Sequence, residues 1–295
     1  MVEFMLDEHP STWGLMGQTI ACANQKGGVG KTTTVVNLAT YLAIQGKRVL
    51  VVDLDPQGNA TSGFGIERPT VERSVYGAMV GSVPLPELIV ETTIPGLDLV
   101  PASLALAGAE VEFAGLMARE RRLSTALDGV AGDRDYILID CPPSLGLLTV
   151  NALTAADAVL IPIQCEYYAL EGVSQLSATI NLVRDHLNPN LEIKGVVLTM
   201  FDARTNLSTE VAAEVRRHLG STVYRTVIPR SVRLSEAPSH GLPVALYRPE
   251  SKGALAYRDL ADEFIRRERR AAPDAPTVGL AFAGVPAGVA QGIES

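Results

Sequence analysis

A glycine-rich segment with two lysines, residues 26–33, carries the clearest chemical signal in this sequence. The phosphate-binding loop pattern G-x-x-x-x-G-K-[ST] would have its first glycine where Gln25 stands, but the second half of the pattern is intact. The glycines allow tight turns that present N–H groups to phosphate oxygens, Lys31 can reach the β- and γ-phosphates, and Thr32 can bind Mg²⁺. The residues expected around a nucleotide's phosphates are Lys26, Gly27, Gly28, Val29, Gly30, Lys31, Thr32 and Thr33.

Lys26 is one cation more than a phosphate cradle needs. A second lysine beside a triphosphate can neutralise charge in the transition state, or it can reach the nucleotide of a neighbouring subunit. The residues alone leave both roles open.

The segments on either side of the loop have the character that phosphate binding requires. Residues 18–24 form a short apolar run with β-branched residues, and residues 33–45 place Val36, Leu38 and Leu42 at helical spacing. The helix N-terminus would then point its free N–H groups at the anion. A glycine-rich turn that binds nothing is the alternative, and this strand–loop–helix arrangement argues against it.

Acidic residues end two further apolar runs. Asp53 ends residues 48–53, and Asp140 ends residues 136–140. Asp140 matches the acidic residue that holds Mg²⁺, usually through water, in P-loop ATPases. Asp53 can serve equally as a structural cap or as a group that helps to hold Mg²⁺ through its water shell.

Asp55 begins a polar segment of turn-forming residues, 55–61, that suits a nucleotide-sensing switch. Its carboxylate can orient or deprotonate the attacking water. It can equally do no more than start the turn before Pro56. The candidate catalytic residues are Lys26, Lys31 and Asp55.

Apolar runs and helical patterns alternate along the chain, which predicts an α/β fold with a doubly wound, mostly parallel sheet. Apolar residues make up 47% of the sequence and aromatic residues 5%, as expected for a parallel sheet that helices cover. We expect a flexible extension over residues 1–17, a folded domain over 18–270 and a disordered Ala/Gly/Pro-rich tail over 271–295. Besides 18–24, the strand-like runs are residues 48–53, 97–101, 136–140, 158–163, 193–200 and 222–227.

Six segments together resemble the ParA/Soj family, the deviant Walker A ATPases of the SIMIBI class of P-loop proteins. Members of this family partition bacterial chromosomes and plasmids. The resemblance extends from about residue 18 to residue 267. The segments that carry it are residues 25–34, 52–61, 140–146, 164–172, 199–206 and 227–238.

The resemblance implies a homodimer that forms with ATP and Mg²⁺, in which Lys26 crosses to the partner's phosphates. It assigns phosphate and Mg²⁺ binding to Lys31 and Thr32, and water activation to Asp55. It places Pro229 near adenine. Family members hydrolyse ATP slowly until a ParB-type partner and DNA stimulate them.

By the same resemblance, the ATP-bound dimer binds double-stranded DNA without sequence preference, and hydrolysis releases it as a diffusing monomer. The implied role is chromosome or plasmid segregation by a cytoplasmic, nucleoid-associated protein with no membrane partner. Residues 1–17 contain no lysine or arginine, which argues against a secretion signal.

Charge is unevenly distributed along the chain. The net charge is −8, yet residues 201–270 hold 13 lysines and arginines against 9 acidic residues. Arg204 and Arg233 match family positions implicated in DNA contact, and Arg230 is a nearby candidate. Such arginines would give sequence-independent, salt-sensitive binding to phosphates. A solvated face with surface ion pairs is the alternative reading of the residues alone.

Four rival functions share this type of site. A nitrogenase-reductase-like electron carrier would need paired cysteines that hold an iron–sulfur cluster at a dimer seam, and no second seam cysteine is evident beside Cys141. A membrane-cycling ATPase of the MinD type calls for a basic amphipathic C-terminal helix, but residues 277–295 contain no lysine or arginine. An amide-forming biosynthetic enzyme would need a small-molecule pocket that no motif indicates. A ParA-like protein that positions another cellular cargo would have nearly the same sequence.

Overall fold

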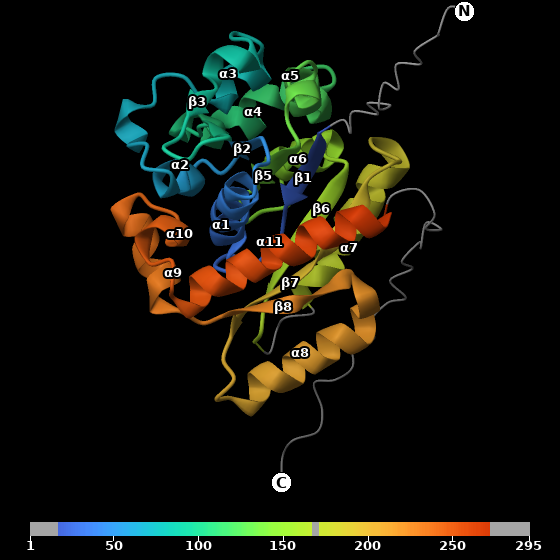
Figure 1. Ribbon diagram of the computed structural model, residues 1–295. Coiled ribbons are helices and arrows are strands. Elements are labelled where there is room, and N and C mark those ends of the chain that lie inside the picture. Colours follow the sequence, from blue (N-terminus) through green and yellow to red (C-terminus); the bar gives the residue numbers. More distant parts are fainter. Residues whose placement is uncertain (1–16, 167–170, 272–295) are drawn as a thin grey trace, which may run out of the picture.

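The computed structural model describes residues 17–166 and 171–271, and within them the strands join one eight-stranded sheet (Figure 1). Their order is β3-β4-β2-β5-β1-β6-β7-β8. Every pairing is parallel except that of β3 with β4. The α/β fold with a doubly wound, mostly parallel sheet is therefore confirmed. The strands are β1 Gln18–Cys22, β2 Val49–Asp53, β3 Val90–Glu91, β4 Leu97–Val100, β5 Tyr136–Asp140, β6 Ala158–Gln164, β7 Glu192–Phe201 and β8 Val223–Pro229.

Strand β1 lies in the middle of the sheet, between β5 and β6. Its last three residues, Ile20, Ala21 and Cys22, are apolar and buried because helices cover both faces of the sheet. The chain passes from β1 to β2 on one side and later from β5 to β6 on the other, so the strand order reverses at β1. Open α/β sheets bind ligands at such a switch point, at the carboxyl ends of the strands.

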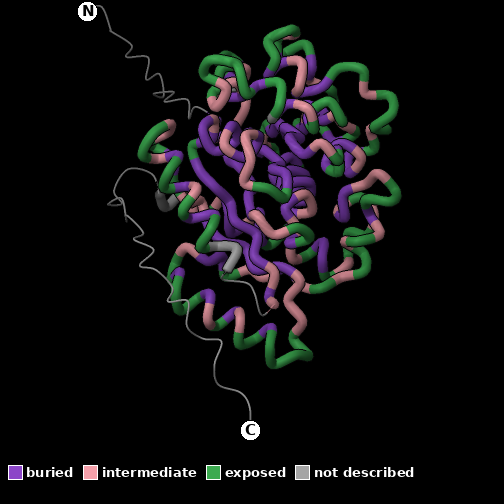
Figure 2. The backbone as a smooth tube through the Cα atoms, turned by 180° about the vertical axis from the view of Figure 1, so that it is seen from behind, coloured by how far each residue is buried: buried purple, intermediate pink, exposed green. Residues whose placement is uncertain are grey.

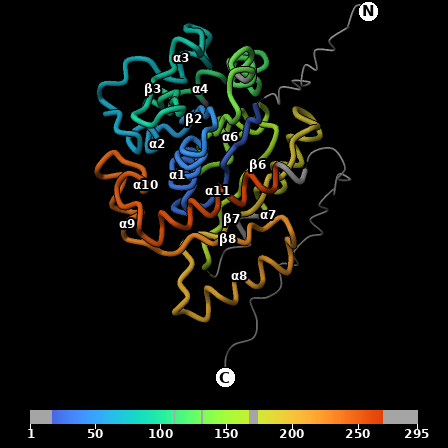
Figure 3. Tube along the Cα trace, viewed as in Figure 1, coloured from blue at the N-terminus to red at the C-terminus, as the bar shows by residue number. Residues whose placement is uncertain are grey.

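Two apolar cores lie on opposite faces of the sheet. Helices α1 and α11 pack on one face, whereas α5, α6, α7 and α8 pack on the other. Figure 2 shows the buried strands enclosed by more exposed helices and loops, and Figure 3 shows α8 beyond the edge strand β8. The helices are α1 Lys31–Ile44, α2 Asn59–Gly63, α3 Val75–Val80, α4 Ala109–Glu112, α5 Arg122–Leu127, α6 Leu147–Ala155, α7 Glu171–His186, α8 Asn206–Leu219, α9 Val232–Glu236, α10 Val244–Tyr247 and α11 Lys252–Ala271.

Each strand-like run of the sequence corresponds to a strand whose ends differ from the predicted ones by at most two residues. Strand β3 was not predicted, because its two exposed residues, Val90–Glu91, form no apolar run. No helix among the described residues is long and apolar enough to cross a membrane. The extension and tail predicted for residues 1–17 and 271–295 lie, apart from one residue each, outside the described residues.

Candidate functional site

The glycine-rich loop joins the carboxyl end of β1 to the first turn of α1. Gly28 and Gly30 have φ angles of 73° and 86°, in the left-handed region that glycine adopts at little cost. Gly30 is also the N-cap of α1, so the loop passes directly into the helix N-terminus. The local sequence therefore produces a turn whose N–H groups face an anion site.

Side chains from the neighbouring strands hold this loop in place. Asn24 donates through Nδ2 to the carbonyl of Pro162 at 2.7 Å and accepts through Oδ1 from the N–H of Lys26 at 3.0 Å. Thr199 on β7 donates to the carbonyl of Val29 at 2.8 Å. These bonds fix the loop on β6 and β7, and among the N–H groups of the loop they use that of Lys26.

The two lysines of the loop have different surroundings. Lys31 is buried, and its Nζ donates to the carbonyl of Lys26 at 3.3 Å. The side chain of Lys26 is 36% exposed. Thr32 and Thr33 follow Lys31 in the first turn of α1. The loop thus pairs one lysine that is fixed inside its own cradle with one that extends outward.

Asp53 and Asp140 lie side by side, because β2 and β5 pair in register at their last residues. Asp53 is fully buried but well satisfied: it accepts hydrogen bonds from the N–H and hydroxyl of Thr61 and from the N–H of Asp55. Burial raises the pKa of Asp53 to about 6, although the Thr61 bonds oppose this. The geometry favours the cap role for Asp53, since its oxygens already hold the loop that follows β2.

Asp140 is different, because both of its carboxylate oxygens are buried without a well-formed hydrogen bond. Burial, and then the charge of Asp53, raise the pKa of Asp140 well above its usual range, while Thr32 and Lys31 favour the charged form. An unsatisfied buried carboxylate is costly unless a cation or donors compensate. A hydrated Mg²⁺ between Thr32 and Asp140 would supply that compensation, so these residues fit the predicted metal site.

Replacing Asp140 with asparagine should stabilise the protein without ligand and weaken its response to Mg²⁺-ATP. Because the folded-state pKa of Asp140 is raised, its contribution to stability is greatest below its ordinary pKa and is lost as pH rises. We therefore expect Asp140→Asn to raise Tm by on the order of 5 °C at pH 8 and by little at pH 4.

Thermal unfolding with and without Mg²⁺-ATP measures both effects. The stabilisation that Mg²⁺-ATP gives the wild type should shrink in the variant, because stabilisation by a ligand grows with the logarithm of the ratio of its concentration to its Kd. Asp128→Asn, at an exposed position, is the matched control. A variant that is no more stable at pH 8 than at pH 4, relative to the wild type, would contradict the buried-charge argument.

Asp55 lies in the turn after β2 and is almost fully buried. Its Oδ1 accepts from the N–H of Gln57 at 2.9 Å, so it does start the turn that the sequence suggested. Its Oδ2 makes no hydrogen bond to a described residue. The N–H of Leu54, the residue before Asp55, donates to the carbonyl of Asp140 at 3.0 Å, so the two acidic residues lie near each other. The charge of Asp55 contributes to the raised pKa of Asp140. The position therefore allows both the turn role and the water-activating role.

Glu166 joins Lys26 to one of the candidate DNA arginines. Its Oε2 lies 3.8 Å from Lys26 Nζ, and its Oε1 lies 3.1 Å from a guanidinium nitrogen of Arg230. Gln164 also donates to Oε1, at 2.6 Å. No role was predicted for Glu166, because nothing in the order of residues shows that these side chains meet.

The other two candidate DNA arginines are also paired. Arg204, after β7, binds Asp202 with two guanidinium nitrogens at 2.9 and 2.7 Å, and its hydrogen bonds hold the pKa of Asp202 far below the usual range. Arg233 on α9 donates to Glu236 at 2.6 Å. Both side chains are at least half exposed, so phosphate groups could reach them.

A cavity of about 400 Å³ lies beside the loop. Gly30, Thr33 and Pro229 line it together with Arg230 and the buried Tyr257. Pro229 is thus next to the phosphate loop, as its predicted place near adenine requires. Arg230 lines the same cavity and therefore faces the nucleotide site as well as the surface.

The glycine loop joins the central strand β1 to the buried helix α1 and holds Lys31. Asp140 ends β5, which lies beside β1 in the sheet. These features define a P-loop nucleoside triphosphatase. A family model described as "AAA domain" matches residues 17–193. The chain is 60% identical over 248 residues to the sporulation initiation inhibitor protein Soj of Bacillus subtilis, which covers 84% of this chain and 98% of that protein. It is 54% identical over 254 residues to the chromosome partitioning protein ParA of Caulobacter vibrioides, covering 85% and 95%.

The chain belongs to the ParA/Soj family of chromosome-partitioning ATPases. It is therefore an ATPase, and its relatives support a role in partitioning.

Solved structures share this fold, and one of the two described here holds a nucleotide. A cobyrinic acid a,c-diamide synthase from Mycobacterium smegmatis with bound ADP and magnesium has a TM-score of 0.77 and 41% identity, and the match covers 87% of this chain and 97% of that one. The cell division ATPase MinD of Pyrococcus furiosus has a TM-score of 0.70 and 27% identity, covering 85% and 100%. These neighbours support nucleotide and Mg²⁺ binding by this fold.

Proposed function

We propose that this chain is the ATP-driven switch of a DNA-partitioning system. The ATP-bound chain forms a homodimer in which each Lys26 contacts the partner's phosphates. The dimer binds nucleoid DNA without sequence preference, and a ParB-type partner stimulates ATP hydrolysis, which releases the monomer. Repeated cycles of this kind would move a chromosome or plasmid through the cytoplasm.

The placement of the arginines carries the proposal. Arg204 follows β7 and Arg230 follows β8, so both lie at the edge of the sheet that also carries the phosphate loop. Glu166 joins Arg230 to Lys26. Movement of Lys26 on ATP binding would therefore change the contacts of Arg230, a candidate DNA contact. A nucleotide-gated DNA switch requires such a connection.

Fluorescence anisotropy with two unrelated duplexes tests this function directly. The full chain is titrated without nucleotide, with ADP and with Mg²⁺-ATP, each at two salt concentrations. We expect binding to both duplexes only with ATP, weakening steeply with salt because phosphate contacts release counterions. Absence of DNA binding in every state would refute the proposal.

Arg233→Glu should weaken DNA binding while leaving ATP hydrolysis without DNA largely unchanged. Removal of a phosphate contact lowers the slope of log K against log salt by about 1, and a reversed charge adds repulsion. Arg258→Glu is the matched control, since the Arg258 side chain is 54% exposed and that of Arg233 is 50% exposed. Equal retention of the two variants on DNA would exclude Arg233 from the contact surface.

The same titrations separate the rival functions. A ParA-like protein that positions another cargo would also bind DNA with ATP, and it would differ only in the partner that stimulates hydrolysis. A MinD-type protein would bind lipid vesicles rather than DNA. Because a solved neighbour is a cobyrinic acid a,c-diamide synthase, failure to bind DNA would make small-molecule amidation the next activity to assay.

A further inference from the structure

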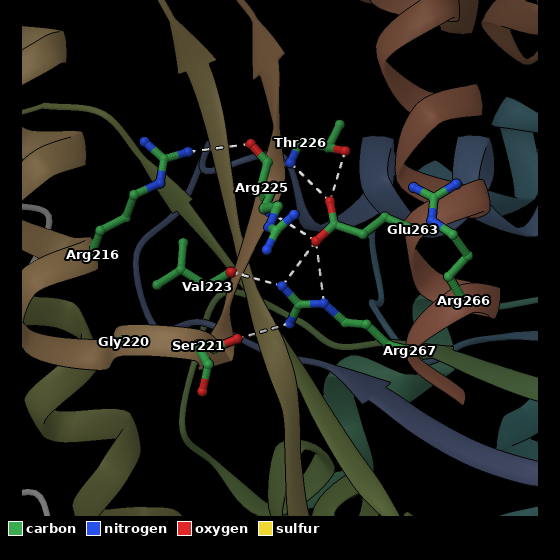
Figure 4. A pocket seen from close by; sticks show the side chains of 9 residues that line it. All are labelled: Arg216, Gly220, Ser221, Val223, Arg225, Thr226, Glu263, Arg266 and Arg267. Carbon is green, nitrogen blue, oxygen red and sulfur yellow. Dashed lines mark hydrogen bonds and ion pairs between the residues drawn. The ribbon is translucent and has the colours of Figure 1, made fainter. Parts of the chain in front are cut away.

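An arginine-rich pocket lies far from the nucleotide site, between the end of α8, the start of β8 and the C-terminal half of α11 (Figure 4). Its volume is about 760 Å³. It opens at the amino end of β8, whereas the phosphate loop and Pro229 lie at the opposite edge of the sheet. The lining residues are Arg216, Gly220, Ser221, Val223, Arg225, Thr226, Glu263, Arg266 and Arg267.

Two of the lining residues close the free edge of β8. Glu263 on α11 is buried and accepts from the N–H groups of Arg225 and Thr226, both at 2.9 Å. Arg267 donates to the carbonyls of Ser221 and Val223 and also to Glu263. A peptide strand therefore cannot simply add to this edge, because its backbone groups are already occupied. Any ligand must be recognised by the remaining side chains.

Three guanidinium groups remain available in the pocket. Arg216, Arg225 and Arg266 are exposed, and none of them forms an ion pair with a carboxylate in the described part of the chain. Among the described residues, Arg216 donates to the carbonyl of Arg225, at 3.3 Å, which turns it toward the strand. In Figure 4 Arg216 enters from α8 and Arg266 from α11, with Arg225 between them.

Carboxylates around the pocket are bound to other groups. Asp262, one turn before Arg266 on α11, accepts from Gln45 at 2.8 Å. Glu263 is paired with Arg267. Glu214 on α8 is paired with Arg217 and His218, and Glu268 on α11 is paired with Lys194. The pocket therefore keeps an excess of positive charge, in a chain whose net charge is −8.

The chemistry of the lining favours phosphate groups of a polymer. Arginine forks match phosphate oxygens. Among the described residues that line the pocket, Val223 alone has an apolar side chain and it is buried, so this part of the chain offers none of the apolar anchors typical of a protein interface. Small-molecule sites enclose most of their ligand, whereas these guanidiniums stand exposed.

We propose that this pocket binds the phosphate backbone of DNA as a second contact site, in addition to that of Arg204, Arg230 and Arg233. This deepens the proposed function and rests on it. Helix α8 has 14 residues and so spans about 20 Å between the two regions, which makes them separate sites whose effects should add.

A salt titration of the double variant Arg225→Ala with Arg266→Ala tests the second site. The full-length protein is loaded with Mg²⁺-ATP, and DNA affinity is measured by anisotropy from low to high salt. Two lost phosphate contacts should reduce the slope of log K against log salt by about 2. Arg267 is left intact because it holds β8. The single variant Arg258→Ala, on α11 like Arg266, is the control. ATP hydrolysis without DNA and thermal unfolding check that the variants fold.

A second measurement does not depend on variants. In wild-type protein with ATP, DNA should protect Arg225 and Arg266 from phenylglyoxal modification, read by mass spectrometry, and leave Arg258 reactive. An unchanged slope in the double variant, or equal modification of Arg225 and Arg266 with and without DNA, overturns the second site. If wild-type protein binds no DNA in any nucleotide state, both the proposed function and the second site fail. If wild-type protein binds DNA with ATP but the slope and the modification do not change, only the second site fails.

Discussion

Lys26→Ala is expected to abolish ATP-driven dimerisation and to lower partner-stimulated ATP turnover on the order of 10³-fold or more, as when a cation supplied from another subunit is lost. The reason lies in the contrast within the loop: Lys31 is held inside its own cradle, whereas Lys26 extends outward. Light scattering with ADP and with Mg²⁺-ATP measures the dimer, and nucleotide binding to the monomer should persist through Lys31.

The loss of the pair between Lys26 and Glu166 does not by itself explain such an effect. Both side chains are more than a third exposed, and exposed pairs contribute about 0–1 kcal/mol. Lys47→Ala removes the same charge at the opposite edge of the sheet, before β2, and should dimerise normally. If Lys26→Ala forms dimers at the ATP concentrations at which the wild type does, Lys26 does not act by crossing to the partner's phosphates.

The ion pair between Lys26 and Glu166 suits a gate in the proposed cycle. In the monomer, Lys26 is already partnered within its own chain, and the same carboxylate holds Arg230. A lysine that moves to a partner's phosphate must leave Glu166, and this removes one of the contacts that hold Glu166 beside Arg230. The proposed movement of Lys26 and the candidate DNA contact Arg230 are thereby connected through one side chain.

The fold and the phosphate loop could be predicted because their signals are local. Apolar runs mark buried strands, and the order of glycine, lysine and threonine fixes the loop. Asp53 and Asp140 could also be placed at one edge of the sheet, since parallel strands bring their carboxyl ends together there. The role of each carboxylate could not be predicted, because it depends on hydrogen bonds that form only in the fold. Thr61 donates to Asp53, whereas the carboxylate oxygens of Asp140 have no well-formed hydrogen bond among the described residues.

The side-chain pairs across the sheet were beyond sequence reasoning for a similar reason. Glu166 meets Lys26 only because β6 lies next to β1, and Glu263 closes β8 only because α11 returns across that strand. Such contacts join residues that are distant in the chain, and no local pattern records them. The arginine-rich pocket was missed in the same way, since its arginines come from three separate elements.

Asp55→Asn should lower the rate of ATP hydrolysis on the order of 10²–10⁴-fold while ATP binding and dimerisation persist. Asparagine keeps the side-chain oxygen that accepts from the N–H of Gln57, so the turn after β2 should survive. What it removes is the carboxylate charge at Oδ2, the atom available to orient or deprotonate water. Asp55→Ala removes both functions and serves as the comparison. Single-turnover hydrolysis and light scattering with ATP measure the two variants.

The pair of variants separates the two roles that the sequence left open. If Asp55 only starts the turn, Asp55→Asn should hydrolyse ATP as the wild type does, and only Asp55→Ala should be impaired. If the carboxylate acts on water, both variants should be slow, and both should accumulate as ATP-bound dimers because the step that ends the dimer is blocked. Such trapped dimers should also stay on DNA, since release in the proposed cycle depends on hydrolysis. Slow turnover with no dimer would instead place Asp55 in nucleotide binding.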